Sequence, residues 1–224
     1  MTAPLPQRLA AEALGTGLLV ATVVGSGIMA ERLAGGNIAL ALLANTLATV
    51  AGLMALILTF GPISGAHFNP AVSLADALAG TSLREMLPYC VAQIAGGCMG
   101  SVLANAMFSE HLVSFSRHAR SGFPQLLGEF VATFGLLAVI WGVSRTRASA
   151  VPFAVGAWIA AAYWFTSSTS FANPAVTIAR CLSDTFAGIR PADAPWFIVA
   201  QIAGALTATM LFRWMKAGQR PAET

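Results

Sequence analysis

The chain has 224 residues, of which 57% are hydrophobic and only 9% are charged, with a net charge of +3. A soluble domain needs roughly a quarter of its residues charged to cover its surface, so this composition excludes a soluble globular protein and predicts a surface that faces lipid. The small basic excess is better explained by membrane topology than by nucleic-acid binding. We therefore expect the lipid bilayer as a partner and no nucleic acid.

Six apolar stretches have lengths near the ~20 residues that span a bilayer as a helix. They lie at 9–30, 38–60, 86–108, 123–144, 149–167 and 194–215. The fifth is short and its end is hard to place. The first contains Glu12 and has a counterpart at 123–144, so we interpret it as a retained helix and not as a cleaved leader. The sequence thus predicts an all-α membrane protein with six transmembrane helices.

Basic residues are unevenly divided between the two ends of these spans. One end holds Arg8, Arg84, Arg145, Arg147, Arg213, Lys216 and Arg220, and the other holds Arg32, Arg117, Arg120 and Arg190. The positive-inside rule predicts cytoplasmic termini in a plasma (inner) membrane. The polar stretch 109–122 then becomes an external connecting loop. Its two histidines are interpreted as solvated residues, and we expect no metal site.

One unit occurs twice in the chain, and we interpret residues 1–224 as a single membrane domain. The hexapeptide Val-Ala-Gln-Ile-Ala-Gly occurs at 91–96 and 199–204, and Asn-Pro-Ala-Val occurs at 69–72 and 173–176. An acid and a threonine one helical turn apart also recur: Glu12 with Thr16, and Glu129 with Thr133. Each unit, at about 8–108 and 123–216, has three spans. Because three is odd, the second unit enters the membrane from the opposite side, and the repeat is inverted.

The Asn-Pro-Ala segments predict two further, shorter helices. Asparagine is a preferred N-cap and proline is favoured at the first helical position. Helices from Asn69 to Gly80 and from Asn173 to Leu182 would be about 15 Å long, half the hydrocarbon thickness. They are predicted to be re-entrant half-helices that end near the midplane. The pore motifs are Asn69, Pro70, Ala71, Asn173, Pro174 and Ala175.

The stretches before the half-helices, 61–68 and 166–172, are predicted to be extended. Non-helical backbone at membrane depth survives only inside protein or along a water-filled cavity. We therefore expect a ladder of pore-lining carbonyls. It comprises Gly65, Ala66, His67, Ser168, Thr169 and Ser170. The inverted repeat would bring Asn69 and Asn173 together, with their amides offered as donors to whatever passes.

Two half-helices that point their N-termini at the centre place positive potential there, which opposes cations. A water held by both asparagine amides would break a proton wire. The predicted function is passive passage of small uncharged molecules, with ions and protons excluded. An ion-coupled carrier is the alternative of another class, although the midplane lacks acid–base groups. The sequence has no catalytic or phosphate-binding motif, so we expect neither an enzyme nor a cofactor.

The paired motifs, the stretch Ser-Gly-Ala-His-Phe-Asn-Pro-Ala-Val at 64–72 and the repeated glutamates resemble the major intrinsic protein family, the aquaporins and aquaglyceroporins. The resemblance covers essentially the whole chain. It implies six tilted helices around each pore, a homotetramer with one pore per subunit, and an arginine-aromatic constriction on the outer side.

The chain departs from the family at this selectivity filter, because Val176 occupies the place of the filter arginine. By spacing, the other filter positions are Thr49, Ser170 and Tyr163, with Ala162 as a competing choice for the last. Similar valines occur in plant vacuolar-type members and in bacterial members associated with arsenic resistance. The resemblance implies a broad channel for water, glycerol and neutral metalloid hydroxides such as arsenite. A strict water channel is the alternative.

Some residues permit two interpretations. Glu12 and Glu129 could form a proton relay, but the resemblance implies buttresses that hydrogen-bond the pore loops. His67 could act by titration or through its backbone carbonyl. Arg180 lies seven residues after Asn173, which is too far to replace the missing filter arginine by simple spacing.

The repeated hexapeptide supplies further candidates for packing. Its glutamines, Gln93 and Gln201, are predicted to pack helices together or to hold loops. Gly96 with Gly100, and Gly204 with Ala208, are pairs of small residues that let helices approach closely.

Overall fold

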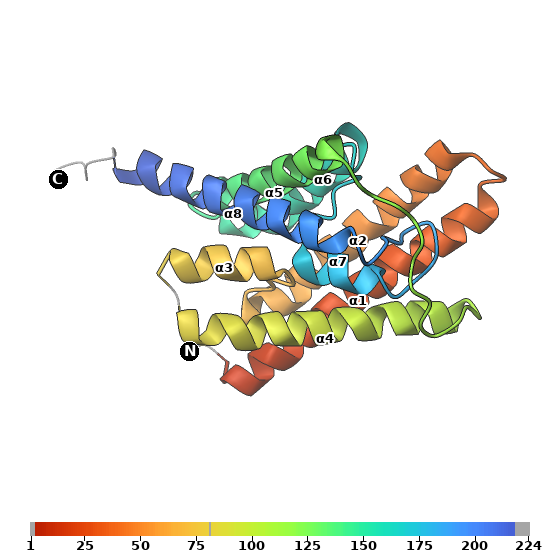
Figure 1. The fold of residues 1–224 in the computed structure, drawn as a ribbon. Coiled ribbons are helices and arrows are strands. Elements are labelled where there is room, and N and C mark those ends of the chain that lie inside the picture. Colours follow the sequence, from red (N-terminus) through yellow and green to blue (C-terminus); the bar gives the residue numbers. More distant parts are fainter. Residues whose placement is uncertain (1–2, 81, 218–224) are drawn as a thin grey trace.

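A computed structural model describes residues 3–80 and 82–217, and all of its regular elements are helices (Figure 1). They are α1 Leu5–Leu33, α2 Ile38–Ser64, α3 Pro70–Leu78, α4 Leu83–Met107, α5 Phe123–Val143, α6 Val151–Phe165, α7 Pro174–Arg180 and α8 Ala194–Ala217. A 3₁₀ turn, Ala148–Ala150, leads into α6. Six of these stretches are long and apolar enough to cross a membrane. The predicted six spans with two additional short helices are confirmed.

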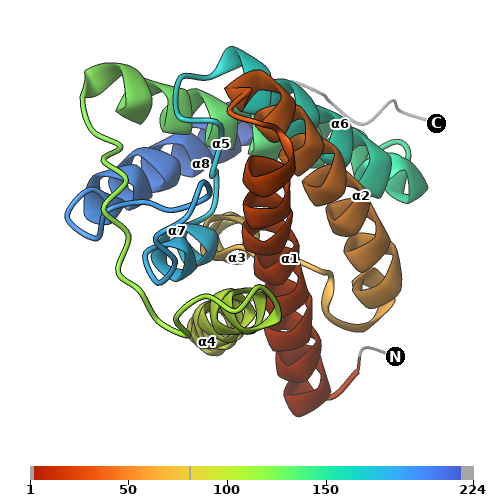
Figure 2. The ribbon, with the colours of Figure 1, turned by 90° about the vertical axis from the view of Figure 1, so that its right-hand side faces the viewer.

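The helices follow the order long, long, short, long, and then repeat it. In the first half α1 packs against α2 and α4, and in the second half α5 packs against α6 and α8. The short helices α3 and α7 lie in the interior, between α4 on one side and α8 on the other (Figure 2). Along the molecule, α3 extends toward the end where α8 finishes, and α7 lies toward the loop that follows α4 (Figure 1).

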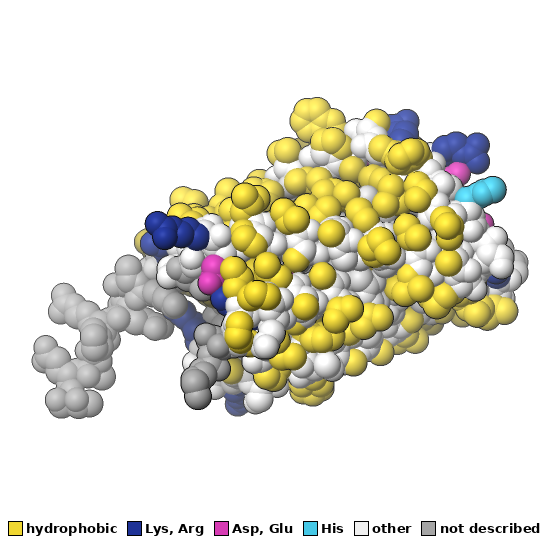
Figure 3. Space-filling model, turned by 90° about the horizontal axis from the view of Figure 1, so that it is seen from below, with side chains coloured by type: hydrophobic (Ala, Val, Ile, Leu, Met, Phe, Trp, Pro, Cys, Tyr) yellow, Lys and Arg dark blue, Asp and Glu magenta, His cyan; other side chains and the backbone are white. Residues whose placement is uncertain are grey.

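The surface has the composition of a lipid-facing protein. Hydrophobic side chains cover the middle of the face in Figure 3, and basic and acidic side chains gather at its two ends. Large apolar side chains such as Met99 and Trp214 are more than half exposed, at 66% and 73%. Such exposure is unfavourable in water over so wide an area, so the chain is a multi-pass membrane protein.

The long helices approach one another closely at the repeated glycines. A Cβ atom added to Gly96 of α4 would lie 2.0 Å from the carbonyl oxygen of Ala13 in α1, and one added to Gly100 would lie 2.1 Å from that of Gly17. In the second half, a Cβ atom on Gly204 would lie 2.4 Å from the carbonyl oxygen of Phe130 in α5. The role expected for these small residues is therefore confirmed.

The helix boundaries differ from the sequence prediction by up to four residues, and three of the differing ends bear on the site. The segment 61–64 was predicted to be extended, but α2 continues through Pro62 to Ser64 and is capped by Gly65 at φ 88°. Proline near a helix end removes one hydrogen bond, whereas an extended stretch in lipid would leave several backbone groups unpaired. The half-helices end at Leu78 and Arg180 instead of Gly80 and Leu182, so both are shorter than predicted.

Candidate functional site

The two Asn-Pro pairs begin the half-helices as their residue types dictate. The side-chain oxygen of Asn69 accepts a hydrogen bond from the backbone N–H of Ala71 at 2.9 Å. Asn173 accepts from Ala175 at 2.9 Å and from Val176 at 3.3 Å. Each proline follows at the first helical position. Its missing N–H costs nothing there, because that group has no partner within the helix.

The amide groups of the same asparagines connect the two halves of the molecule. Asn69 Nδ2 donates to the carbonyl oxygen of Ala172 at 2.8 Å, and Asn173 Nδ2 donates to that of Phe68 at 2.7 Å. The two half-helices therefore meet at their N-terminal ends. Each NH₂ group has two hydrogens, so one remains after the cross-connection, and both asparagines line an internal cavity.

The segments before the asparagines share an unusual backbone conformation. At one, three and four residues before each asparagine the φ angle is positive. These residues are Gly65, Ala66 and Phe68 in the first half, and Thr169, Ser170 and Ala172 in the second. Five of the six are not glycine, and left-handed conformations of such residues are costly unless the surroundings impose them.

Two buried carboxylates impose this conformation by binding the backbone directly. Glu12 accepts hydrogen bonds from the N–H groups of His67 at 3.0 Å and Phe68 at 2.7 Å. Glu129 accepts from those of Phe171 and Ala172, both at 2.8 Å. Because the donors occupy the same positions relative to the asparagines, the two halves hold their loops in the same way.

The repeated glutamines form a further layer behind the carboxylates. Gln93 Nε2 donates to Glu12 at 2.7 Å and to Ser73 at 2.9 Å. Gln201 Nε2 donates to Glu129 at 2.6 Å and to Thr177 Oγ1 at 2.9 Å. Of the two roles considered for these glutamines, the structure places them where they hold the loops through the carboxylates.

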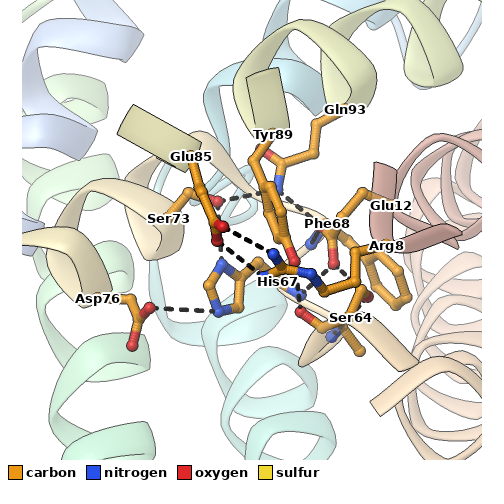
Figure 4. A network of polar contacts seen from close by, with 11 residues as sticks. Arg8, Glu12, Ser64, His67, Phe68, Ser73, Asp76, Glu85, Tyr89 and Gln93 are labelled. Carbon is orange, nitrogen blue, oxygen red and sulfur yellow. Dashed lines mark hydrogen bonds and ion pairs between the residues drawn. The ribbon is translucent and has the colours of Figure 1, made fainter. Parts of the chain in front are cut away.

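The first half has additional polar contacts around its carboxylate (Figure 4). Ser64 Oγ donates to Glu12 at 2.6 Å. His67 lies between Ser73 and Asp76, with Nδ1 3.1 Å from Ser73 Oγ and Nε2 3.9 Å from the Asp76 carboxylate. The site therefore has an imidazole and a carboxylate side by side at the end of the cavity where α3 lies.

A cavity of about 260 Å³ runs past both loops. Its wall contains all four residues predicted for the selectivity filter: Thr49, Tyr163, Ser170 and Val176. Tyr163 lines the wall and Ala162 does not, and the Tyr163 hydroxyl donates to Thr49 Oγ1 at 3.4 Å.

The predicted carbonyl ladder is only partly on this wall. Gly65, Ala66 and His67 line the cavity, as does Ser170. Ser168 and Thr169 do not; the carbonyl oxygen of Ser168 faces the Arg120 guanidinium at 3.4 Å instead.

Sequence reasoning considered Arg180 only as a replacement for the filter arginine and set it aside, and it gave Arg120 no role near the cavity. Arg180 lines the cavity, and its guanidinium carbon lies 3.4 Å from the centre of the Phe171 ring. Arg120, which was assigned to an external loop, is only 8% exposed. A signal for Arg180 was present, because residues four apart share a helix face, and Val176 precedes it by that spacing.

Six apolar spans around two half-helices that meet at capped asparagines, beside an internal cavity, define a membrane channel with re-entrant pore segments. The family model described as "Major intrinsic protein" matches residues 2–170 and 143–224. The chain belongs to this major intrinsic protein family.

Two curated relatives extend over almost the whole chain. Aquaglyceroporin AqpS of Rhizobium meliloti (strain 1021) is 53% identical over 218 residues, which cover 97% of this chain and 93% of the relative. Probable aquaporin AqpM of Archaeoglobus fulgidus is 31% identical over 245 residues, covering 96% and 99%. The solved structure of the aquaglyceroporin from Plasmodium falciparum has a TM-score of 0.72 at 21% identity, with 96% of each chain covered. That structural likeness shows the shared fold.

Proposed function

We propose that this protein is a passive channel for small uncharged solutes, namely water, glycerol and neutral metalloid hydroxides such as arsenite. The observation that carries this function is the pair of asparagine amides on the cavity wall, each with a hydrogen left to donate. An oxygen-bearing neutral solute can accept these hydrogen bonds as it passes. Family membership and the aquaglyceroporin named among its relatives support the same function.

The chemistry at the meeting point contributes to the exclusion of ions and protons. Asn69 and Asn173 bring donors but no carboxylate to the middle of the cavity. A water molecule that accepts from both amides has its own hydrogens directed away from the centre, which interrupts proton transfer along a file of waters. An ion-coupled carrier would need acid–base groups at this place, so the channel is the better supported of the two classes.

We propose Thr49, Tyr163, Ser170 and Val176 as the selectivity filter. Replacing an arginine by valine at position 176 removes five N–H donors and a permanent charge. The passage is then wider and less polar than one built for water alone, which favours a broad solute range over the alternative of a strict water channel. The 53% identity to a protein named an aquaglyceroporin supports this choice.

The loop residues take supporting roles in this proposal. Glu12 and Glu129 act as buttresses, because every described hydrogen bond of their carboxylates comes from loop backbone, Ser64 or the repeated glutamines. The carbonyls of Gly65, Ala66 and His67 guide the solute on one side of the asparagines, and that of Ser170 does so on the other.

We also propose a homotetramer in the plasma (inner) membrane, with cytoplasmic termini. The tetramer rests on family resemblance. The orientation rests on the excess of basic residues at the end of the spans that holds Arg8, Arg84 and Arg213.

The experiment that tests the function is swelling of proteoliposomes in water, glycerol, urea and arsenite. For Val176→Arg we expect glycerol and arsenite flux to fall by roughly tenfold or more, the scale of discrimination that pocket size gives. Water flux should fall less. Val176→Thr, which keeps the side-chain size, is the matched control and should retain the wild-type order of solutes. Equal flux ratios in all three proteins would place the constriction elsewhere, and counter-flow with saturation would identify a carrier.

A further inference from the structure

The cavity wall contains an arginine that does not occupy the filter position. Val176 and Arg180 both line the cavity, and α7 runs from Pro174 to Arg180. Residues four apart lie on one face of a helix, about 6 Å apart along its axis. Arg180 therefore lies one turn beyond Val176, farther from Asn173.

The guanidinium of Arg180 is held in place from two sides. Its Nε donates to the carbonyl oxygen of Ala187. Its flat face lies over the Phe171 ring, at 3.4 Å from the centre, and the Phe171 backbone is itself bound by Glu129 at 2.8 Å. Its two terminal nitrogens have no hydrogen-bond partner within residues 3–80 and 82–217. Neither nitrogen is fully buried against other protein atoms. These donors are available to a molecule in the cavity.

A second guanidinium reinforces the positive charge at this end. Arg120 lies 5.0 Å from the centre of the same Phe171 ring. Its side chain donates to the carbonyl oxygens of Gly188 at 2.8 Å and of Ser168 at 3.4 Å. Burial lowers the pKa of Arg120 to about 10, so the group remains charged at neutral pH. Arg120 does not line the cavity, and its contacts hold the loops around Phe171.

Neither guanidinium forms an ion pair with a carboxylate within 4.0 Å, where the structure describes side chains. Asp193 accepts a hydrogen bond from the backbone N–H of Arg120 at 2.9 Å, not from its guanidinium. Two acids of the surrounding loops are matched to other arginines: Asp184 to Arg117 at 2.9 Å and Asp193 to Arg190 at 2.8 Å. The Arg180 end of the cavity therefore has a net positive charge.

We propose that Arg180 is the specificity-determining cation of this channel, excluding cations at the pore mouth and binding the acceptor oxygens of neutral solutes that enter. Arg120 is a positioning residue for it. The inference rests on the proposed channel function and deepens it. It separates two tasks: Val176 leaves the constriction wide for solutes, while the charge that rejects cations lies one helical turn away.

The test measures water flux and proton leak in the same proteoliposomes, the leak with a pH-sensitive dye under an imposed proton gradient. For Arg180→Met we expect water flux to persist and proton leak per unit of water flux to rise by roughly tenfold or more, because a unit charge several ångströms away at partial burial contributes at least that much. Arg180→Lys should remain proton-tight. If the Arg180→Met protein fails to assemble, Arg180→Gln takes its place in the test. Glutamine keeps a donor for the carbonyl oxygen of Ala187 but has no charge, so this variant should also leak protons.

A rescue variant distinguishes a charge role from a structural one. Val176→Arg combined with Arg180→Met returns a cation to the same helix face, and should restore proton exclusion. Arg117→Met removes an arginine whose side chain is 90% exposed outside the cavity, and should behave as wild type. An Arg180→Met protein that carries water and remains proton-tight would overturn the role of Arg180. A wild-type protein that carries none of water, glycerol and urea would instead overturn the proposed function.

Discussion

Individual carboxylates determine the conformation of the pore loops. Glu129 is fully buried, and it accepts hydrogen bonds from two backbone N–H groups and from Gln201. The same carboxylate thus offsets the positive φ angles of Ser170 and Ala172. A carboxylate is suited to this task because it offers only acceptors, with about four lone-pair sites.

We predict that Glu129→Leu destabilises the protein by about 3 kcal/mol or more, because each buried donor left without an acceptor costs about 1–3 kcal/mol. Denaturant unfolding in detergent micelles measures the change. Glu110→Gln is the control: Glu110 is partly exposed at the surface and paired with Arg32 at 2.7 Å, and such surface pairs contribute about 0–1 kcal/mol. Equal unfolding midpoints for the two variants would show that the loop does not depend on this carboxylate.

At the residue scale, the sequence predicts contacts within a repeat better than contacts between distant loops. Glu12, Glu129, Asn69 and Asn173 are identified because each has a counterpart in the other half. Arg120 has none. It is buried because the loop at 109–122 pairs with the backbone beyond α7, for example Ser116 N–H to the carbonyl oxygen of Cys181 at 2.9 Å. No local pattern in the chain encodes that pairing.

Among the helices, starts were predicted more accurately than ends. Asn-Pro specifies a helix start through a side-chain acceptor and a fixed φ, and both half-helices begin as expected. Their ends depend on weaker preferences, so Leu78 and Arg180 could not be chosen over residues one or two positions later. The small-residue segment 61–64 was predicted to be extended, but α2 continues through Pro62 to Ser64. Unpaired backbone in lipid costs more than the one hydrogen bond that the proline removes.

Packing between α1 and α4 gives a prediction at the same scale. Gly96→Ala should destabilise the protein by about 1–3 kcal/mol, the cost of overpacking, because the new Cβ would lie 2.0 Å from the rigid carbonyl oxygen of Ala13. Gly61→Ala in α2 is the matched control: its Cβ would meet nothing within 4 Å. This variant should be neutral or up to about 1 kcal/mol more stable, since alanine favours helices. Thermal unfolding in detergent compares the two, and identical melting temperatures would contradict the packing argument.

For the whole molecule, the inverted repeat makes each half depend on the other at one place. The asparagine of each half-helix caps its own helix and also donates to the loop of the opposite half. The donors and acceptors are related by the same symmetry, because each acceptor carbonyl immediately precedes the other asparagine. Neither loop can therefore keep its conformation independently of its partner.

This dependence predicts the result of a double-mutant cycle. Asn69→Ala and Asn173→Ala should each cost about 1–3 kcal/mol, since a cap and a buried acceptor are lost. The double variant should cost less than the sum, by about 0.5 kcal/mol or more, as residues in one network do. Unfolding free energies of the four proteins in detergent measure the coupling. Ser26→Ala in the first half and Thr209→Ala in the second half provide an uncoupled control pair. The Ser26 hydroxyl forms hydrogen bonds within α1 and with Asn45, and the Thr209 hydroxyl forms them within α8 and with Trp141. Strict additivity for the asparagines would mean that the two loops fold as separate units.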